Sequence, residues 1–163
     1  MDHVRYIERT REYYAAEGYE KPYEWAHFAE VPFTPLAKPL ADCRIALVST
    51  SDVQFKDDAA AQSDFNAFTG NVYSFPSQTP AAALFSRQEH FDRHATHIDD
   101  VDSYFPLTRL RELAAAGHIT DLTLRVHGVF TSYSRRKTLE SDGPEVLKRC
   151  REDGADAVLL TPI

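Results

Sequence analysis

The sequence predicts a three-layer α/β fold with a mostly parallel sheet, of the Rossmann-like or flavodoxin-like kind. Residues 43–49 are a short apolar run, which is typical of a strand buried on both faces. Residues 145–154 have apolar positions at helical spacing and end at a glycine, and a second apolar run follows at 156–161. Helix, glycine and strand form half of a βαβ unit, so we expect both runs to lie in one sheet.

Length and composition fit one domain. The chain has 163 residues, of which 43% are hydrophobic, and this is enough to form a core without disulfides. We therefore expect a single α/β domain over residues 1–163, with a sheet that is incomplete at its C-terminal end. Within it, residues 1–42 supply a helix and a segment rich in proline and aromatic residues, and residues 43–163 supply the sheet core.

Charge and cysteine content exclude several classes of protein. A net charge of -7 disfavours nonspecific binding to nucleic acid. No apolar run approaches the roughly 20 residues of a membrane span, and the polar N-terminus does not read as a signal peptide. We therefore expect a cytoplasmic protein with neither nucleic acid nor membrane as a partner. Cys43 and Cys150 lack CxxC spacing and are interpreted as partly buried thiols.

The N-terminal third begins with an amphipathic pattern. Residues 4–17 predict a helix that ends at Gly18. Residues 21–39 alternate aromatic residues with prolines, which predicts an irregular segment packed on the domain by its rings. Residues 53–80 have little pattern apart from a short strand at 72–75.

The C-terminal half has clearer signals. Residues 106–116 predict a helix with proline in its first turn and Gly117 after its end. Residues 119–129 predict a strand or extended segment. A polar stretch then leads into the helix at 145–154.

A block of histidines and aspartates precedes the helix at 106–116. Imidazoles and carboxylates this close together can hold a metal or transfer protons, or they can form a solvated loop whose aspartates cap the next helix. Their spacing matches neither a zinc finger nor an HExxH motif, so we assign no metal to the site. The block comprises His90, His94, His97, Asp99, Asp100 and Asp102.

Other candidate residues follow predicted strands. Ser49 and Thr50 stand at the carboxyl end of the run at 43–49, where open α/β sheets bind ligands. Arg125 and His127 lie beside Gly128, shortly before the last helix, and could hold a carboxylate or phosphate; capping of that helix is the alternative role for this stretch. The sequence has no GxGxxG, P-loop or GxSxG motif.

Three segments together resemble the selenoprotein B family of glycine, sarcosine, betaine and D-proline reductases, most closely its short proline-reductase type. They are His94-Ala-Thr-His-Ile-Asp-Asp100, then Tyr104-Phe-Pro-Leu-Thr-Arg-Leu-Arg-Glu-Leu-Ala-Ala-Ala-Gly-His-Ile119, and Glu152-Asp-Gly-Ala-Asp-Ala-Val-Leu-Leu-Thr-Pro162. The resemblance implies reductive cleavage of a carbon–nitrogen bond alpha to a carboxylate, with electrons from a dithiol.

This resemblance also guides the assignment of roles. His94 and His97 are the predicted proton-transfer or substrate-orienting residues. Ser49 and Thr50 are expected to line the pocket, and Arg125 or His127 to bind the substrate carboxylate. The expected partners are a small amino-acid-like or carboxylate substrate, a partner reductase subunit or thiol electron donor, and a second copy of the chain.

The family places its selenocysteine or cysteine nucleophile just after a strand like that at 156–161. We expect the nucleophile just after Ile163, with a UGA codon read as a stop, so the chain itself carries no cofactor and a full-length form carries selenocysteine. Two alternatives remain open. One is a non-catalytic carboxylate-binding or subunit-assembly module, and the other is a metal-dependent lyase or hydrolase that uses the His/Asp block.

Overall fold

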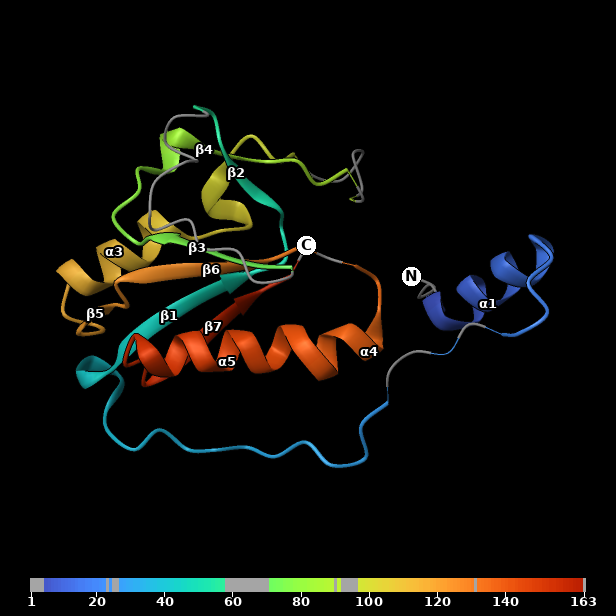
Figure 1. Cartoon of the computed structure of the whole chain (residues 1–163), viewed down its shortest axis with the longest axis horizontal. Helices are drawn as coiled ribbons and strands as arrows, with labels where there is room; N and C mark the ends of the chain where they lie inside the picture. The colour runs from blue at the N-terminus through green and yellow to red at the C-terminus, as the bar shows by residue number, and fades with distance from the viewer. Residues whose placement is uncertain are drawn as a thin grey trace. The chain divides into compact units, whose positions relative to one another are not determined.

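Strand β1 (Arg44–Ser49) is the centre of the sheet in the computed structural model (Figure 1). Along one edge it pairs in parallel with β7 (Ala157–Thr161), from Ile45 opposite Ala157 to Ser49 opposite Thr161. The two apolar runs of the sequence are therefore neighbouring parallel strands, as predicted.

Two short strands share the other edge of β1. Strand β5 (Asp121–Leu122) pairs with its first residues, and β6 (Arg125–Val129) pairs with its last, both in parallel. Strand β3 (Val72–Pro76) runs antiparallel to β6. The fold is thus α/β with a mixed, mostly parallel sheet, and the strand predicted at 72–75 is confirmed.

A separate antiparallel pair lies beside this sheet. It is formed by β2 (Val53–Phe55) and β4 (Leu84–Ser86). The sequence did not predict either strand, because three residues are too few to show the alternation of a half-buried strand.

Helices pack against opposite faces of β1 (Figure 1), because successive side chains of a strand point to opposite sides. Helix α5 (Gly143–Glu152) meets the face that carries Ala46 and Val48. Helix α3 (Leu107–Ala115) contributes to the core on the other face, with Ile45 and Leu47. Helix α5 continues a short helix α4 (Arg135–Lys137) through a π-helical turn at Thr138–Asp142. Both long helices confirm the sequence prediction.

The structure describes residues 5–22, 24, 27–57, 71–89, 91, 97–130 and 132–162. The chain divides into two units, Met1–Thr34 and Pro35–Ile163. None of the helices in the described part of the chain is both long and apolar enough to cross a membrane.

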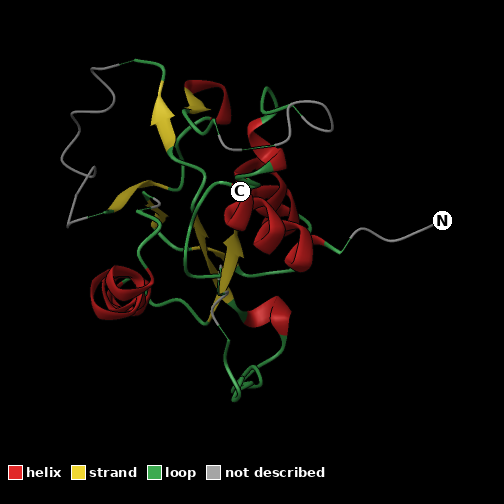
Figure 2. Ribbon diagram, turned by 90° about the vertical axis from the view of Figure 1, so that its right-hand side faces the viewer, coloured by secondary structure: helices red, strands yellow, loops and turns green. Residues whose placement is uncertain are grey.

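The first unit contains the predicted N-terminal helix, α1 (Tyr6–Ala16), which has no buried residue. From Gly18 to Pro39 the described residues form neither helix nor strand (Figure 2). Phe28 is 55% exposed and Phe33 is 88% exposed. The packing of this segment on the sheet core stays a prediction. The segment lacks the regular spacing that would gather its rings on one face. Tyr23 and Trp25 lie outside the described residues.

Strand β7 is only partly buried. It pairs with β1, and no described residue pairs with its other edge. Val158 is 42% exposed and Leu160 is 67% exposed. A strand with one neighbour leaves part of each face open, and this exposure fits the expectation of a sheet that is incomplete at this end.

Gly128 allows a close contact inside the sheet. It lies opposite Tyr73 across the β3–β6 pair, and a Cβ atom at Gly128 would overlap the Tyr73 ring. The ring is buried, and its hydroxyl accepts a hydrogen bond of 2.7 Å from the backbone N–H of Val53 at the start of β2. One aromatic side chain thus joins the main sheet to the β2–β4 pair.

We predict that Gly128→Ala lowers the free energy of unfolding by about 1–3 kcal/mol, because the Tyr73 ring has no room to move away within the core. Denaturant unfolding measures the change. Combining Gly128→Ala with Tyr73→Leu should destabilise the protein by less than the sum of the single changes. Simple additivity of the two variants would contradict the overlap as the cause.

Candidate functional site

The carboxyl end of β1 gathers buried hydroxyl groups. The Ser49 hydroxyl lies 2.6 Å from that of Ser51 and donates to the Thr161 carbonyl at 2.9 Å. The backbone N–H of Thr50 donates to the same carbonyl at 3.3 Å. The structure therefore places the two predicted residues Ser49 and Thr50 together, at the point where β1 and β7 end.

Ser86 at the end of β4 extends this group of hydroxyls. Its hydroxyl donates a short hydrogen bond to the Ser51 carbonyl and accepts one of 3.0 Å from the Gln88 N–H. Tyr104 lies on the other side, where its carbonyl accepts a hydrogen bond from Ser49. Sequence reasoning missed Ser86 and Tyr104, because their neighbours in the chain carry no catalytic motif.

The Tyr104 hydroxyl is buried and has no hydrogen-bond partner among the described residues. Burial raises the pKa of Tyr104 to about 12, although the nearby backbone of Ser86 acts in the opposite direction. The phenol therefore stays protonated at neutral pH, with its proton still available to donate.

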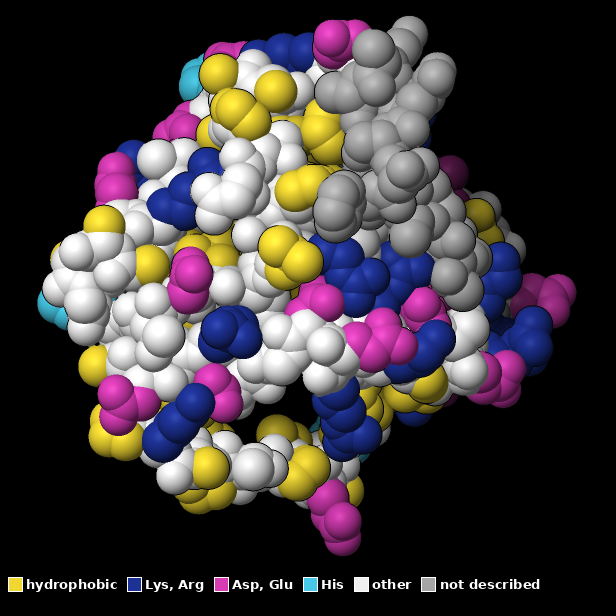
Figure 3. Space-filling model, turned by 60° about the vertical axis from the view of Figure 1, so that its left-hand side comes forward, with side chains coloured by type: hydrophobic (Ala, Val, Ile, Leu, Met, Phe, Trp, Pro, Cys, Tyr) yellow, Lys and Arg dark blue, Asp and Glu magenta, His cyan; other side chains and the backbone are white. Residues whose placement is uncertain are grey.

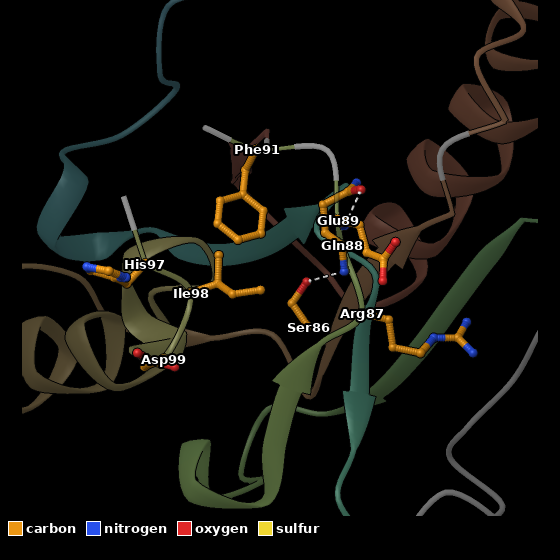
Figure 4. Close-up of a pocket in the computed structure, with 8 residues that line it drawn as sticks. All are labelled: Ser86, Arg87, Gln88, Glu89, Phe91, His97, Ile98 and Asp99. Carbon is orange, nitrogen blue, oxygen red and sulfur yellow. Dashed lines mark hydrogen bonds between the residues drawn. The ribbon is translucent and has the colours of Figure 1, made fainter. Parts of the chain in front are cut away.

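Ser86 also lines a pocket of about 690 Å³ that opens beside the hydroxyl cluster (Figure 4). Phe91 and Ile98 form an apolar centre, while charged or protonatable side chains surround it. In Figure 4, His97 and Arg87 extend to opposite sides. The described lining residues are Ser86, Arg87, Gln88, Glu89, Phe91, His97, Ile98 and Asp99. Mixed charge around an apolar centre suits a small ligand that carries both signs of charge.

His97 is thus the member of the predicted catalytic pair that the structure places in a pocket. It is exposed there, next to Ile98 and Asp99. His94 lies outside the described residues, as does His90. No group of three or more His, Cys, Asp or Glu side chains in the described part of the chain could hold a metal ion.

Arg125 lies at the opposite end of the sheet from Ser49 and Thr50. Its guanidinium donates to the Asp153 carboxylate at 2.7 and 3.0 Å, and this hydrogen bond raises the arginine pKa. Asp153 is the residue that follows α5. The arginine predicted to bind the substrate carboxylate therefore holds the end of a helix against β6.

His127 belongs to the same buried network and not to the pocket. It is fully buried, its Nδ1 lies 2.8 Å from the Ser74 hydroxyl, and its Nε2 lies 3.5 Å from the Asp153 carboxylate. Burial lowers the pKa of His127 to about 4, against the attraction of Asp153. The ring is therefore neutral at physiological pH.

Arg149 completes this network from α5. It is buried, donates to the Ser74 hydroxyl at 2.6 Å and to the Glu145 carboxylate at 2.8 Å. Glu145, Arg149 and Asp153 are spaced four residues apart, so they share one face of the helix. That spacing was the sequence signal for a polar helix face turned toward β3 and β6.

Both cysteines are buried away from the pocket. Cys43 adjoins the start of β1, and Cys150 packs from α5 against Ala46 and Val48. Burial raises the pKa of the Cys150 thiol. The thiolate is the reactive form of cysteine, so this environment disfavours a nucleophilic role.

Comparison with known proteins identifies a distant relative. The chain is 30% identical over 133 residues to the D-proline reductase subunit gamma of Acetoanaerobium sticklandii. The match covers 79% of this chain and 52% of that subunit, so the chain spans about half the length of the relative. No protein-family model matches the chain, and no solved structure shows significant similarity to it. The chain is therefore distantly related to D-proline reductase.

The buried His127 predicts a loss of stability in acid. Its folded-state pKa of about 4 lies below its ordinary value of 6.5, so the unfolded chain binds a proton at a higher pH than the folded chain. The free energy of unfolding should fall between pH 6.5 and 4, by roughly 3 kcal/mol from this group.

Urea unfolding at a series of pH values measures this loss. His127→Asn should flatten the dependence in that window, whereas His118→Asn, at an exposed position, should leave it unchanged. An unaltered slope in the His127 variant would rule out this histidine as the source.

Proposed function

We propose that this chain is part of a reductase of the D-proline reductase type, and that it binds a small amino-acid-like carboxylate substrate. The observation that carries the proposal is the match to D-proline reductase subunit gamma over most of the chain. The pocket beside the carboxyl end of β1 supports it, since open α/β sheets bind ligands at that edge.

The reaction that we propose is reductive cleavage of a carbon–nitrogen bond alpha to the carboxylate. The bond takes up two electrons and two protons, and a dithiol that supplies them becomes a disulfide. His97 lines the pocket, and we assign it to proton transfer or substrate orientation, together with His94. Ser49 and Thr50, proposed to line the pocket, join the ends of β1 and β7 and are not among the described lining residues.

The shape and charge of the pocket support a substrate of this class. Phe91 and Ile98 can pack against a small hydrocarbon skeleton, while Arg87 at the rim supplies a cation for a carboxylate and Glu89 or Asp99 an anion for an amine. On the face drawn in Figure 3, acidic and basic side chains are interspersed.

The redox nucleophile is a separate question. Cys43 and Cys150 are both buried, and neither lines the pocket. We therefore propose that a selenocysteine or cysteine other than these two attacks the substrate, and that a partner subunit or thiol donor regenerates it.

A second candidate function is non-catalytic. Burial of both thiols favours a module that binds the carboxylate substrate or assembles with a catalytic subunit. A metal-dependent lyase or hydrolase that uses the His/Asp block stays a further proposal, and His90 and His94 of that block lie outside the described residues.

Three further proposals concern the whole protein. The helices on opposite faces of β1 support a three-layer fold of the Rossmann-like or flavodoxin-like kind. The exposed apolar residues of β7 support a homodimer. The cytoplasm, where a dithiol donor stays reduced, is the location that suits this chemistry.

We predict that the chain binds D-proline but does not turn it over alone. Titration calorimetry measures binding, and consumption of dithiothreitol in the presence of D-proline measures turnover. Absence of binding would contradict the proposed substrate, and turnover by the isolated chain would contradict the assignment of the nucleophile elsewhere.

In an active complex, His97→Ala should lower kcat by about 100-fold without unfolding the chain, whereas His118→Ala should leave kcat unchanged.

We also predict that neither cysteine reacts with iodoacetamide in the native protein, because both side chains are buried. Mass spectrometry should find both thiols unmodified at neutral pH and both alkylated after unfolding in guanidinium. Rapid alkylation of native Cys43 or Cys150 would restore that residue as a candidate nucleophile.

A further inference from the structure

We propose that Arg87 is the carboxylate-binding residue of the pocket, and that the Asp52 carboxylate pairs with its guanidinium until a ligand arrives. The carboxylate of the ligand then takes the place of the Asp52 carboxylate on the guanidinium group. This inference rests on the proposed function for the class of ligand, and it adds the residue that recognises the ligand and the group that competes for it.

The first observation is the geometry of the resting pair. Arg87 approaches Asp52 through two nitrogens, with Nε 3.3 Å from Oδ2 and Nη2 3.4 Å from Oδ1. Two contacts from one guanidinium form the fork that arginine uses for carboxylates. Both are longer than the 2.7 Å contact of Arg125 with Asp153 and the 2.8 Å contact of Arg149 with Glu145. The orientation suits a carboxylate, but the contact with Asp52 is loose.

The second observation is exposure. The Arg87 side chain is 58% exposed, and it lines the pocket. An ion pair this open to water contributes little stability, so exchange of its carboxylate costs little. Asp52 keeps its own negative charge when a ligand arrives, so it competes with the incoming carboxylate for the single guanidinium. The arginine that the sequence suggested, Arg125, is instead paired with Asp153 at 2.7 Å.

The third observation concerns Asp52 itself. Its φ of 46° lies in the left-handed region, directly after the central strand. Its Oδ1 also accepts a hydrogen bond of 2.9 Å from the Gln54 side chain. When Arg87 binds a ligand, the Asp52 carboxylate therefore still accepts a hydrogen bond from Gln54. An asparagine at this position can adopt the same backbone conformation and lacks the competing charge.

The arrangement also orients the ligand. In Figure 4, Arg87 and His97 point outward on opposite sides of the pocket, away from Phe91 and Ile98. A carboxylate held by Arg87 therefore lies at the rim of the pocket, on the side opposite His97. The residue proposed for proton transfer then lies on the side away from the bound carboxylate.

The test compares the affinities of acetate and D-proline for the wild-type chain and three variants by titration calorimetry. Arg87→Gln should lower the affinity for both ligands by about tenfold or more, since it removes a charge-assisted pair. Asp52→Asn should raise the affinity for both ligands several-fold, because it removes the competing negative charge and keeps the backbone conformation. Arg109→Gln, on α3 outside the described pocket lining, loses the same charge and should change neither affinity.

The direction of the Asp52→Asn effect is decisive. Weaker binding in that variant, or unchanged binding in Arg87→Gln, would overturn the proposed exchange of carboxylates on Arg87. Thermal unfolding serves as the control that each variant is folded. Arg87→Lys keeps the charge without the fork and should restore only part of the affinity. If neither acetate nor D-proline binds the wild type, the carboxylate site is overturned.

The same data separate this inference from the proposed function. Acetate binding that follows the expected order, without binding of D-proline, would support the role of Arg87 and contradict the substrate. D-proline binding that is indifferent to Arg87→Gln and Asp52→Asn would support the substrate and overturn the exchange.

Discussion

The parallel pairing of β1 with β7 is the contact on which the rest of the structure depends. It joins residues more than a hundred positions apart in the chain, from Ile45 opposite Ala157 to Ser49 opposite Thr161. Since α5 leads directly into β7, this pairing also fixes where α5 crosses the sheet. The apolar side of the helix then meets Ala46 and Val48, and its polar side meets β3 and β6.

The two sides of α5 stabilise the fold in different ways. Cys150 and Val146 pack against aliphatic side chains of β1 and contribute through burial of apolar surface. Arg149 and Asp153 instead meet Ser74, His127 and Arg125, in a network whose polar groups lie away from water. Such a network tolerates few rearrangements, because any slip of the helix would leave buried charges without partners. The polar side therefore specifies the position of the helix, while the apolar side supplies much of the driving force.

The polar residues of the chain fall into two groups with different prospects for function. Arg125 and His127 are engaged in the network under α5 and are not among the described residues that line the pocket. Arg87 and His97 lie at the pocket, and the Arg87 guanidinium pairs there with Asp52 at 3.3 Å. Distant relation to D-proline reductase gives this second group a chemical context, because a small carboxylate requires a cation that can be reached from solvent.

The sequence by itself determined the elements that depend on local pattern. The run at 43–49, the helix at 106–116 and the helix, glycine and strand at 145–161 were each predicted and found, because apolar spacing and glycine stops act over one or two turns. It also determined that Ser49 and Thr50 would stand at the carboxyl end of the central strand. The resemblance carried by residues 94–119 and 152–162 pointed to the same family as the relative found by comparison.

Only the tertiary structure decided which polar residues remain open to a ligand. Arg87 and Asp52 are 35 positions apart and meet because β2 pairs with β4, whose three-residue strands leave no readable pattern. Arg125 looked equally able to bind a carboxylate, but its partner Asp153 comes from the end of a distant helix. Residue type and spacing state which groups a chain possesses. Long-range pairing settles which of them are already bound to one another, since the partner that neutralises a charge is chosen by the fold and not by its neighbours in sequence.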